Sequence, residues 1–307
     1  MGPGADIRLL KRNEIDDGRW NNCICNASNG IIYSYTWYLD RLAENWFGLV
    51  YKDYQFVMAV PYKKKAGIRY VYHPALVPQL GVIGNDIPGE LPESFIRSIP
   101  PDYKLIDYTI INQTIISIDD CKVTPAVNYT LSLHKPYDIL KKQFTTNTIR
   151  NIAKHKQEGT ITKKIDTTDT INLAKKQFSG FPKNVLAALD KYVDLNNNCP
   201  DENKCVNYGY INEQQKLEAA ASIMFSNNRI YYLVVTNSPE AKTKGASHKI
   251  IDAILKDHAG TDVVLDFEGS DIPGIASFYR GFGATACHYQ KLYINRLNFL
   301  LRTLASK

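Results

Sequence analysis

The chain has 307 residues, of which 44% are hydrophobic and 22% are charged. This composition is too apolar for a disordered chain, and the length suits one large or two medium globular domains. No apolar run approaches the roughly 18 residues that a bilayer span requires, and the N-terminus lacks the basic and apolar regions of a signal peptide. We therefore expect a cytoplasmic protein of two domains, without stable membrane insertion.

Cysteine usage and charge exclude few classes but limit the chemistry. The six cysteines are scattered, with no CxxC pair and no histidine at metal-ligand spacing, so we expect reduced thiols and no metal site. The net charge of +6 is compatible with a polyanionic ligand without requiring one. A basic tract from Lys135 to Lys164 fits either a phosphate-binding surface or a solvated helix face.

Apolar spacing and polar turns divide the first half of the chain into helices and strands. The predicted helices are 14–25, 36–45 and 91–98, and the predicted strands are 47–51, 55–62, 68–73, 104–111 and 129–133, with Lys63-Lys64-Lys65 at a hairpin tip. Between them, Pro74 to Gly89 is rich in proline and glycine yet carries Leu76, Val77, Leu80, Val82 and Ile83. This pattern predicts a loop that lines a cleft rather than a solvated tether.

The second half begins with a predicted helix over 148–156, for which Gly159 is the expected C-terminal signal. Helices 168–178, 182–195, 244–258 and 272–280 and strands 205–211, 217–225, 229–236, near 263 and 288–294 follow. The order of elements predicts an α+β fold, or α/β in looser schemes, with mixed and mostly antiparallel sheets. We expect domains at 1–146 and 147–307.

The turn after the strand 229–236 leads into a helix through Lys242-x-x-Gly245-x-Ser247. A helix that begins on small residues presents unpaired backbone N–H groups and the positive end of its dipole. Such a start can bind an anion, most often a pyrophosphate. An ordinary helix N-terminus is the competing interpretation.

Two acidic residues and a tyrosine follow the strand near 263. Asp266 and Glu268 are two residues apart, so on a continuing strand they would face the same side. Either could act as a base or hold an amine, although capping of the next helix would also explain them. Tyr279 is the candidate general acid, with packing in the core as the alternative.

These motifs resemble known families. Lys242-x-x-Gly245-x-Ser247 resembles the acyl-CoA pyrophosphate loop of the GNAT N-acyltransferase superfamily, with Lys and Ser in place of the usual outer residues. Phe278-Tyr279, followed by Phe282-Gly283, resembles the Phe-Tyr helix after the fifth strand of that superfamily.

The order of further motifs resembles the FemABX aminoacyltransferases, which are built from two tandem GNAT-like domains. Asp266-Phe267-Glu268-Gly269 with the downstream glycines, Arg150-Asn151-Ile152 after the strand 129–133, and Pro78-Gln79-Leu80 all resemble segments of that family. Together they cover about residues 30 to 295.

The resemblance implies an acyl-CoA donor, most simply acetyl-CoA, and no metal. The residues that it implies are Val234, Val235 and Thr236 for the pantetheine arm, Lys242, Lys244, Gly245, Ala246 and Ser247 for the pyrophosphate, and Gln79, Arg150 and Asn151 for the acceptor. Arg150 and Asn151 could instead serve to tie the domains together. Peptidyl-transferring relatives usually carry Lys where this chain has Tyr279, and their tRNA-using members commonly have a coiled coil, of which this sequence has no heptads.

We therefore predict an N-acyltransferase that moves an acyl group from acyl-CoA to an amine in a cleft between two domains. The acceptor would be a small molecule or a cell-envelope precursor. The alternatives are aminoacyl transfer from a tRNA to a cell-wall precursor, and a non-catalytic GNAT-like binding module. A dinucleotide site is excluded, because Gly281 to Ala286 matches the fingerprint only in letters and lies between a helix and a strand in the reversed order.

Overall fold

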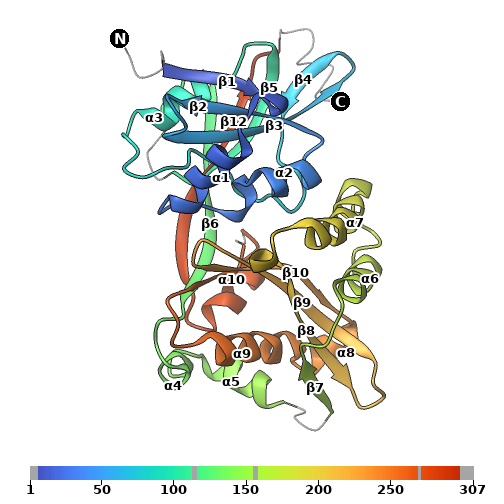
Figure 1. Cartoon of the computed structure of the whole chain (residues 1–307). Coiled ribbons are helices and arrows are strands. Elements are labelled where there is room, and N and C mark those ends of the chain that lie inside the picture. The colour runs from blue at the N-terminus through green and yellow to red at the C-terminus, as the bar shows by residue number, and fades with distance from the viewer. Residues whose placement is uncertain (1–5, 113–115, 155–157, 269–270, 298–307) are drawn as a thin grey trace. The chain divides into compact units, whose positions relative to one another are not determined.

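The structure, a computed structural model, describes residues 6–112, 116–154, 158–268 and 271–297. The chain forms two compact units, which Figure 1 shows coloured along the chain. Unit 1 comprises the described residues of 1–126 and 288–307, and unit 2 comprises those of 127–287.

Each unit contains a mixed sheet with one parallel pair of strands. In unit 1 the strand order is β1 (Ile7–Lys11), β2 (Asn45–Tyr51), β3 (Phe56–Lys65), β4 (Ile68–Val71), β5 (Tyr103–Ile110) and β12 (Thr285–Asn295). Only β4 and β5 run parallel, and the other neighbours pair antiparallel. The prediction of a mixed, mostly antiparallel sheet is confirmed.

Unit 2 repeats this arrangement. Its order is β6 (Cys121–Ser132), β11 (Val264–Asp266), β10 (Arg229–Asn237), β9 (Leu217–Ser226), β8 (Val206–Asn212) and β7 (Gly159–Thr162). Only β10 and β11 run parallel. The two units therefore carry the same strand pattern twice.

The strands β6 and β12 explain why the units divide at other positions than the expected boundary at residue 146. β6 follows β5 in the chain, but its second half pairs with β11 of unit 2. β12 follows unit 2 in the chain, but it pairs with β5 of unit 1. Residue 146 is the first of α5 (Thr146–Ala153), which belongs to unit 2.

The core of unit 1 is centred on an aromatic contact between a helix and the sheet. Its helices are α1 (Asp17–Asn26), α2 (Thr36–Leu42) and α3 (Leu91–Arg97). Trp20 of α1 is fully buried, its indole N–H donates to the Ser34 carbonyl at 2.8 Å, and its ring centroid lies 5.4 Å from that of Trp46. Gly48 of β2 makes room for Trp20, because a Cβ there would lie 2.6 Å from the indole ring.

The loop predicted over Pro74 to Gly89 is present, and four of the aliphatic side chains that it carries are buried. Val77, Leu80 and Val82 are fully buried in unit 1. Ile83 is equally buried and forms an isolated bridge with Val57 of β3. Burial of these side chains accounts for the apolar character of a segment without helix or strand.

Helices cover both faces of the sheet in unit 2. They are α4 (Tyr137–Lys141), α5, α6 (Thr167–Gln177), α7 (Lys183–Asn198), α8 (Pro239–Thr243), α9 (Ala246–His258) and α10 (Pro273–Arg280). Ala221 and Ile223 of β9 belong to the core cluster with α9 and α10, whereas Ser222 between them accepts a hydrogen bond from Tyr192 of α7 at 3.1 Å. Because side chains alternate along a strand, α7 and α9 lie on opposite faces.

Three local predictions were wrong or incomplete. Gly159 does not end a helix but begins β7, and β1 and β7 were not predicted. Lys63 to Lys65 are the last residues of β3, and the turn falls on Ala66 and Gly67.

In the described part of the chain no helix is both long and apolar enough to cross a membrane.

Gly48→Ala should lower the free energy of unfolding by about 2 kcal/mol, because the added methyl group must displace the Trp20 ring from a close-packed core. Chemical denaturation followed by tryptophan fluorescence measures the change. Gly89→Ala is the control, since a Cβ at Gly89 would meet nothing within 4 Å. Equal stability of the two variants would contradict the packing described for Trp20.

Candidate functional site

The site begins where two parallel strands part. β10 pairs with β11 only from Arg229 to Tyr231, opposite Val264 to Asp266. Beyond this point β10 continues to pair with β9, with an irregularity between Tyr232 and Val234. No other strand among the described residues pairs with the opposite edge of β10 here. Backbone groups of β10 after Tyr231 therefore have no strand partner on that edge among the described residues.

Asp266 fixes the point at which the strands separate. The residue is 4% exposed, and its side chain accepts hydrogen bonds from Asn128 Nδ2 at 2.7 Å, from Arg229 Nη1 at 2.8 Å and from the Glu268 backbone N–H at 3.0 Å. These bonds use both carboxylate oxygens of Asp266 and hold β10 and β11 together where they separate.

Glu268 does not lie on a continuing strand, so the alternation argument that paired it with Asp266 does not apply. β11 ends at Asp266, and Glu268 adopts a left-handed backbone with φ of +65°. Both of its carboxylate oxygens are buried. Burial raises the pKa of Tyr279 and the Glu268 charge raises it further. Burial lowers the pKa of Arg229, but Asp266 and, more weakly, Glu268 raise it, so the Glu268 carboxylate lies near both groups.

Tyr279 lies on α10 and is 9% exposed. Its ring stacks on Phe267, with centroids 4.4 Å apart and planes at 20°. Burial raises the pKa of the Tyr279 phenol, and the carboxylates of Glu268 and Asp266 raise it further. The phenol therefore keeps its proton well above neutral pH, as a general acid must. The three residues predicted to be catalytic are brought together in unit 2.

The joint between β10 and α9 has one more element than the sequence indicated. The short helix α8 comes first, capped by the Ser238 hydroxyl, which accepts from the Ala241 N–H at 3.1 Å. Gly245 then adopts φ of +69°, and α9 begins at Ala246 rather than at 244. Ser247 donates its hydroxyl to Asn237 Oδ1 at 2.9 Å. The amides in the first turn of α9 have no intrahelical acceptor, as at any helix start.

Gly245 is required by packing as well as by its backbone angle. A Cβ at this position would lie 2.5 Å from the backbone carbonyl oxygen of Asn151 at the end of α5. Asn151 thus has a structural role against the start of α9, whatever else it contacts. Its side-chain amide donates to the Asn147 carbonyl at 2.9 Å.

The two lysines of the joint differ in their surroundings. Lys244 Nζ lies 3.6 Å from Oε2 of the buried Glu218 and 4.0 Å from Glu158. Lys242 is exposed and has no ion-pair partner among the described residues. Lys244 is therefore already paired with carboxylates of the protein, whereas Lys242 is free to contact an anion.

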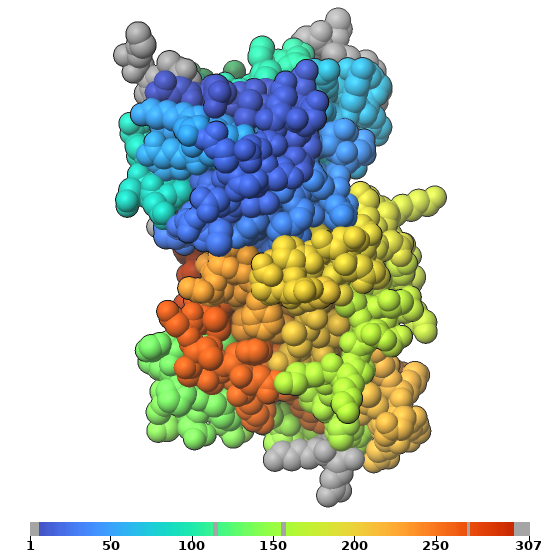
Figure 2. Space-filling view, viewed as in Figure 1, coloured from blue at the N-terminus to red at the C-terminus, as the bar shows by residue number. Residues whose placement is uncertain are grey.

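The remaining acceptor candidates belong to different units of the chain. Arg150 is exposed and donates to Asn147 Oδ1 at 2.8 Å, within its own helix. The green surface at the lower left of Figure 2 belongs to the segment that includes α4 and α5. Gln79 is 9% exposed and belongs to unit 1.

Sequence reasoning missed several residues of this region. Gln177 at the end of α6 accepts from Thr236 Oγ1 at 2.9 Å and from the Asn237 N–H at 2.5 Å, which secures the end of β10. Arg229 and Asn128 hold Asp266. Opposite charges at the start of β10 and the end of β11 would have suggested the Arg229 pair once the two strands were taken as parallel neighbours.

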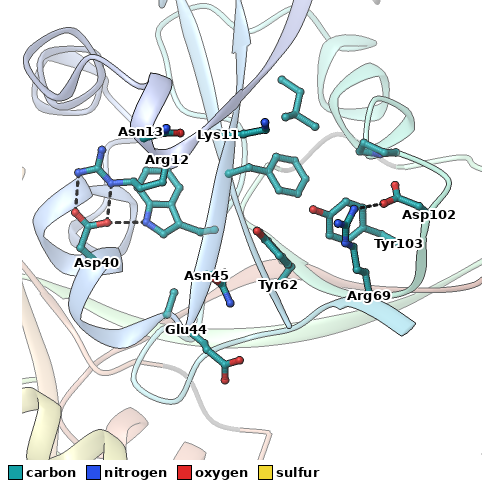
Figure 3. A pocket seen from close by; sticks show the side chains of 15 residues that line it. Lys11, Arg12, Asn13, Asp40, Glu44, Asn45, Tyr62, Arg69, Asp102 and Tyr103 are labelled. Carbon is teal, nitrogen blue, oxygen red and sulfur yellow. Dashed lines mark hydrogen bonds and ion pairs between the residues drawn. The ribbon is translucent and has the colours of Figure 1, made fainter. Parts of the chain in front are cut away.

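One pocket lies in unit 1 and contains none of the predicted site residues (Figure 3). Its volume is about 900 Å³. On one side Arg12 forms two hydrogen bonds of 2.7 Å with Asp40, which also accepts from the Trp46 indole at 2.8 Å, and on the other Arg69 pairs with Asp102 at 2.6 Å. Paired charges of both signs make this pocket unsuited to a pyrophosphate.

No family model matches the chain, and no curated protein matches it. Solved structures do. FemX shares 13% identity, with a TM-score of 0.67 over 98% of this chain and 100% of that one. A conserved protein of unknown function from Bacteroides thetaiotaomicron has 11% identity and a TM-score of 0.60 over 92% and 98%. L-PGS from Bacillus licheniformis has 10% identity and a TM-score of 0.51 over 85% and 87%.

The chain has a FemABX-like fold. The expected architecture of two GNAT-like domains is thereby confirmed, together with the repeated strand pattern of units 1 and 2. At these identities the likeness concerns the fold. In the part of the chain that the structure describes, no three histidine, cysteine, aspartate or glutamate residues are grouped to hold a metal ion.

Gly245→Ala should destabilise the protein by about 3 kcal/mol, through left-handed strain together with the clash against Asn151. Gly260→Ala is the matched control, because Gly260 has φ of +80° and no neighbour within 4 Å of a Cβ. It should cost only the strain, about 1 kcal/mol. Denaturation midpoints report the difference, and equal losses would mean that α5 does not abut the start of α9.

Proposed function

We propose that the protein is an N-acyltransferase that moves an acyl group from acyl-CoA, most simply acetyl-CoA, to an amine. One observation carries the proposal: a buried, protonated Tyr279 near two carboxylates, in the unit where β10 parts from β11. An acyl transfer needs a bound donor, an amine that has lost its proton, and an acid for the leaving thiolate. Residues of unit 2 offer a group for each of these tasks.

The donor would bind along the open edge of β10. Backbone groups of Val234, Val235 and Thr236 would pair with the two amides of the pantetheine arm, as another strand would do. The pyrophosphate would then meet the first-turn amides of Ala246 and Ser247, at the positive end of the α9 dipole. Lys242 would add a positive charge, since Lys244 is engaged with Glu218.

The reaction would proceed by attack of the amine nitrogen on the thioester carbonyl carbon. As the new C–N bond forms, the C–S bond breaks and its electron pair moves to sulfur. Tyr279 would transfer its phenolic proton to that sulfur and would regain a proton from solvent. Glu268 would accept the proton that the ammonium loses before it attacks, and the second N–H proton, lost after the C–N bond has formed, would pass to solvent. Asp266 would hold the strand ends in place.

An aminoacyl-tRNA is the alternative donor. The FemX-like fold and the exposed basic residues Lys141, Lys142 and Lys154 favour it. The acceptor would then be a cell-wall precursor. A tRNA bound through its phosphates should lose affinity steeply as salt rises from 50 to 200 mM, by about 10³-fold if six or more phosphates are neutralised. Absent or salt-insensitive tRNA binding would remove this alternative.

A non-catalytic binding module is the second alternative, and the ion pair that neutralises Lys244 favours it. An acetyl-CoA binding measurement, combined with a thiol-release assay over a broad panel of amines, distinguishes an acyltransferase from a binding module. Binding without thiol release by any amine would support the module. Release that depends on an amine would exclude it.

Tyr279→Phe should lower turnover by about 10²-fold or more, because the leaving thiolate loses its proton donor. Affinity for acetyl-CoA should remain, since the phenyl ring keeps the stack on Phe267. Initial rates and calorimetric binding measure the two effects. Turnover equal to that of the wild type would sink the acid role.

The raised pKa of Tyr279 sets the alkaline limit of activity. The acid is active in its protonated form, and its folded pKa lies above the ordinary tyrosine value of about 10. In the wild type, activity should therefore persist at pH 10, apart from the ionisation of other groups. A loss centred below pH 9 that is absent in Tyr279→Phe would contradict the burial described for this phenol.

A further inference from the structure

Tyr232 occupies the first position of β10 beyond the strand pairing with β11. Its predecessor Tyr231 is the last residue of β10 to pair with β11, opposite Asp266. Because side chains alternate along a strand, Tyr232 faces the side of the sheet that carries α9 and α10, and it belongs to the core cluster with Tyr279. Neither the sequence motifs nor the proposed reaction uses it.

Phe267 connects Tyr232 with Tyr279. The ring of Tyr232 meets Phe267 edge-on, with centroids 5.9 Å apart and planes at 77°. The rings of Phe267 and Tyr279 are stacked face to face, with centroids 4.4 Å apart. Both tyrosines thus pack on one aromatic ring. Burial raises the pKa of the Tyr232 phenol, and the nearby Tyr279 raises it further.

The hydroxyl of Tyr232 is an unusual group for a protein interior. The residue is 2% exposed, and its buried oxygen has no hydrogen-bond partner in the described part of the chain. Buried hydroxyls are nearly always bonded, because an unbonded one has lost its water without replacement. A phenylalanine would fill the same space without that penalty, so the hydroxyl calls for an explanation.

The proposed reaction creates a need that this hydroxyl can meet. When Tyr279 gives up its proton, it becomes a phenolate in a buried place beside Glu268 and Asp266. Burial and both carboxylates disfavour that anion. A neutral O–H donor close by would stabilise it, and a bond that forms mainly when the charge develops contributes to rate rather than to binding.

We propose that Tyr232 is a positioning residue that acts through Tyr279, by donating its hydroxyl hydrogen to the Tyr279 oxygen as that oxygen passes its proton to the leaving sulfur. The inference rests on the proposed function. No proton leaves Tyr232: the O–H bond of Tyr279 breaks, the S–H bond forms, and the C–S electron pair remains on sulfur. Tyr279 is reprotonated from solvent before the next turnover.

The test is a double-mutant cycle of Tyr232→Phe and Tyr279→Phe in the full chain, with acetyl-CoA as donor and an amine that the wild type accepts. Tyr232→Phe should lower kcat about tenfold, the effect of one buried hydrogen bond, and leave KM for acetyl-CoA unchanged. In the Tyr279→Phe background it should have no further effect, because its partner oxygen is gone. The unliganded variant should melt no lower than the wild type.

Tyr192→Phe is the matched control in the same unit. Tyr192 is equally buried, but its hydroxyl donates to Ser222 and accepts from Cys205 at 3.1 Å each. Removing this hydroxyl should lower the melting temperature, and it should not change the effect of Tyr232→Phe or Tyr279→Phe on kcat. A second readout does not depend on residual activity in Tyr279→Phe. Replacing Tyr279 by a more acidic difluorotyrosine should restore part of the turnover lost in Tyr232→Phe.

The outcomes separate this inference from the proposed function. Unchanged kcat in Tyr232→Phe, an equal loss in the Tyr279→Phe background, or no rescue by the fluorinated residue would overturn the role of Tyr232 alone. A wild type that transfers no acetyl group to any amine, and does not bind acetyl-CoA, would overturn the proposed function and this inference with it.

Discussion

The buried carboxylate of Asp266 holds together the two strands whose separation opens the candidate site. It ends β11, pairs with Arg229 at the start of β10, and accepts a further bond from Asn128 of β6. Three strands are therefore joined at one charged group. Removing the carboxylate would leave the half-buried guanidinium of Arg229 without the group to which it is bonded, so the loss would exceed what the pair itself contributes to stability.

The same carboxylate links the fold to the chemistry. Its bond to the Glu268 N–H accompanies the left-handed turn that directs the chain away from the strand. Phe267, between the two acids, provides the surface on which Tyr279 and Tyr232 pack. A single short segment thus sets the environment of the proposed acid, because burial and two nearby carboxylates together hold its proton in place.

The sequence predicted the elements well where the pattern is local. Helical spacing located α2, α3, α6, α7 and α9 within a few residues, and alternation located the strands from β8 to β10. The motifs around Tyr279 and Gly245 indicated the right part of the chain, and the FemABX-like fold was expected from them.

Pairing between distant segments could not be predicted in the same way. β6 follows unit 1 in the chain but completes the sheet of unit 2, and β12 follows unit 2 but completes the sheet of unit 1. The local sequence of these strands does not indicate either pairing. The motif alone assigns Lys244 to phosphate. Its buried partner Glu218 is 26 residues away on β9, so the ion pair is not visible in the local sequence. Glu268 was placed on a strand because the end of β11 depends on contacts with Asp266 that the sequence does not display.

Hydrogen exchange of the wild-type protein, with and without acetyl-CoA, tests most directly whether the open edge of β10 is the donor site. The account predicts that acetyl-CoA slows exchange of the backbone amides in Tyr232–Thr236 and at the start of α9, near Ala246 and Ser247. Binding that leaves these amides unchanged, and protects another part of the chain instead, would contradict it.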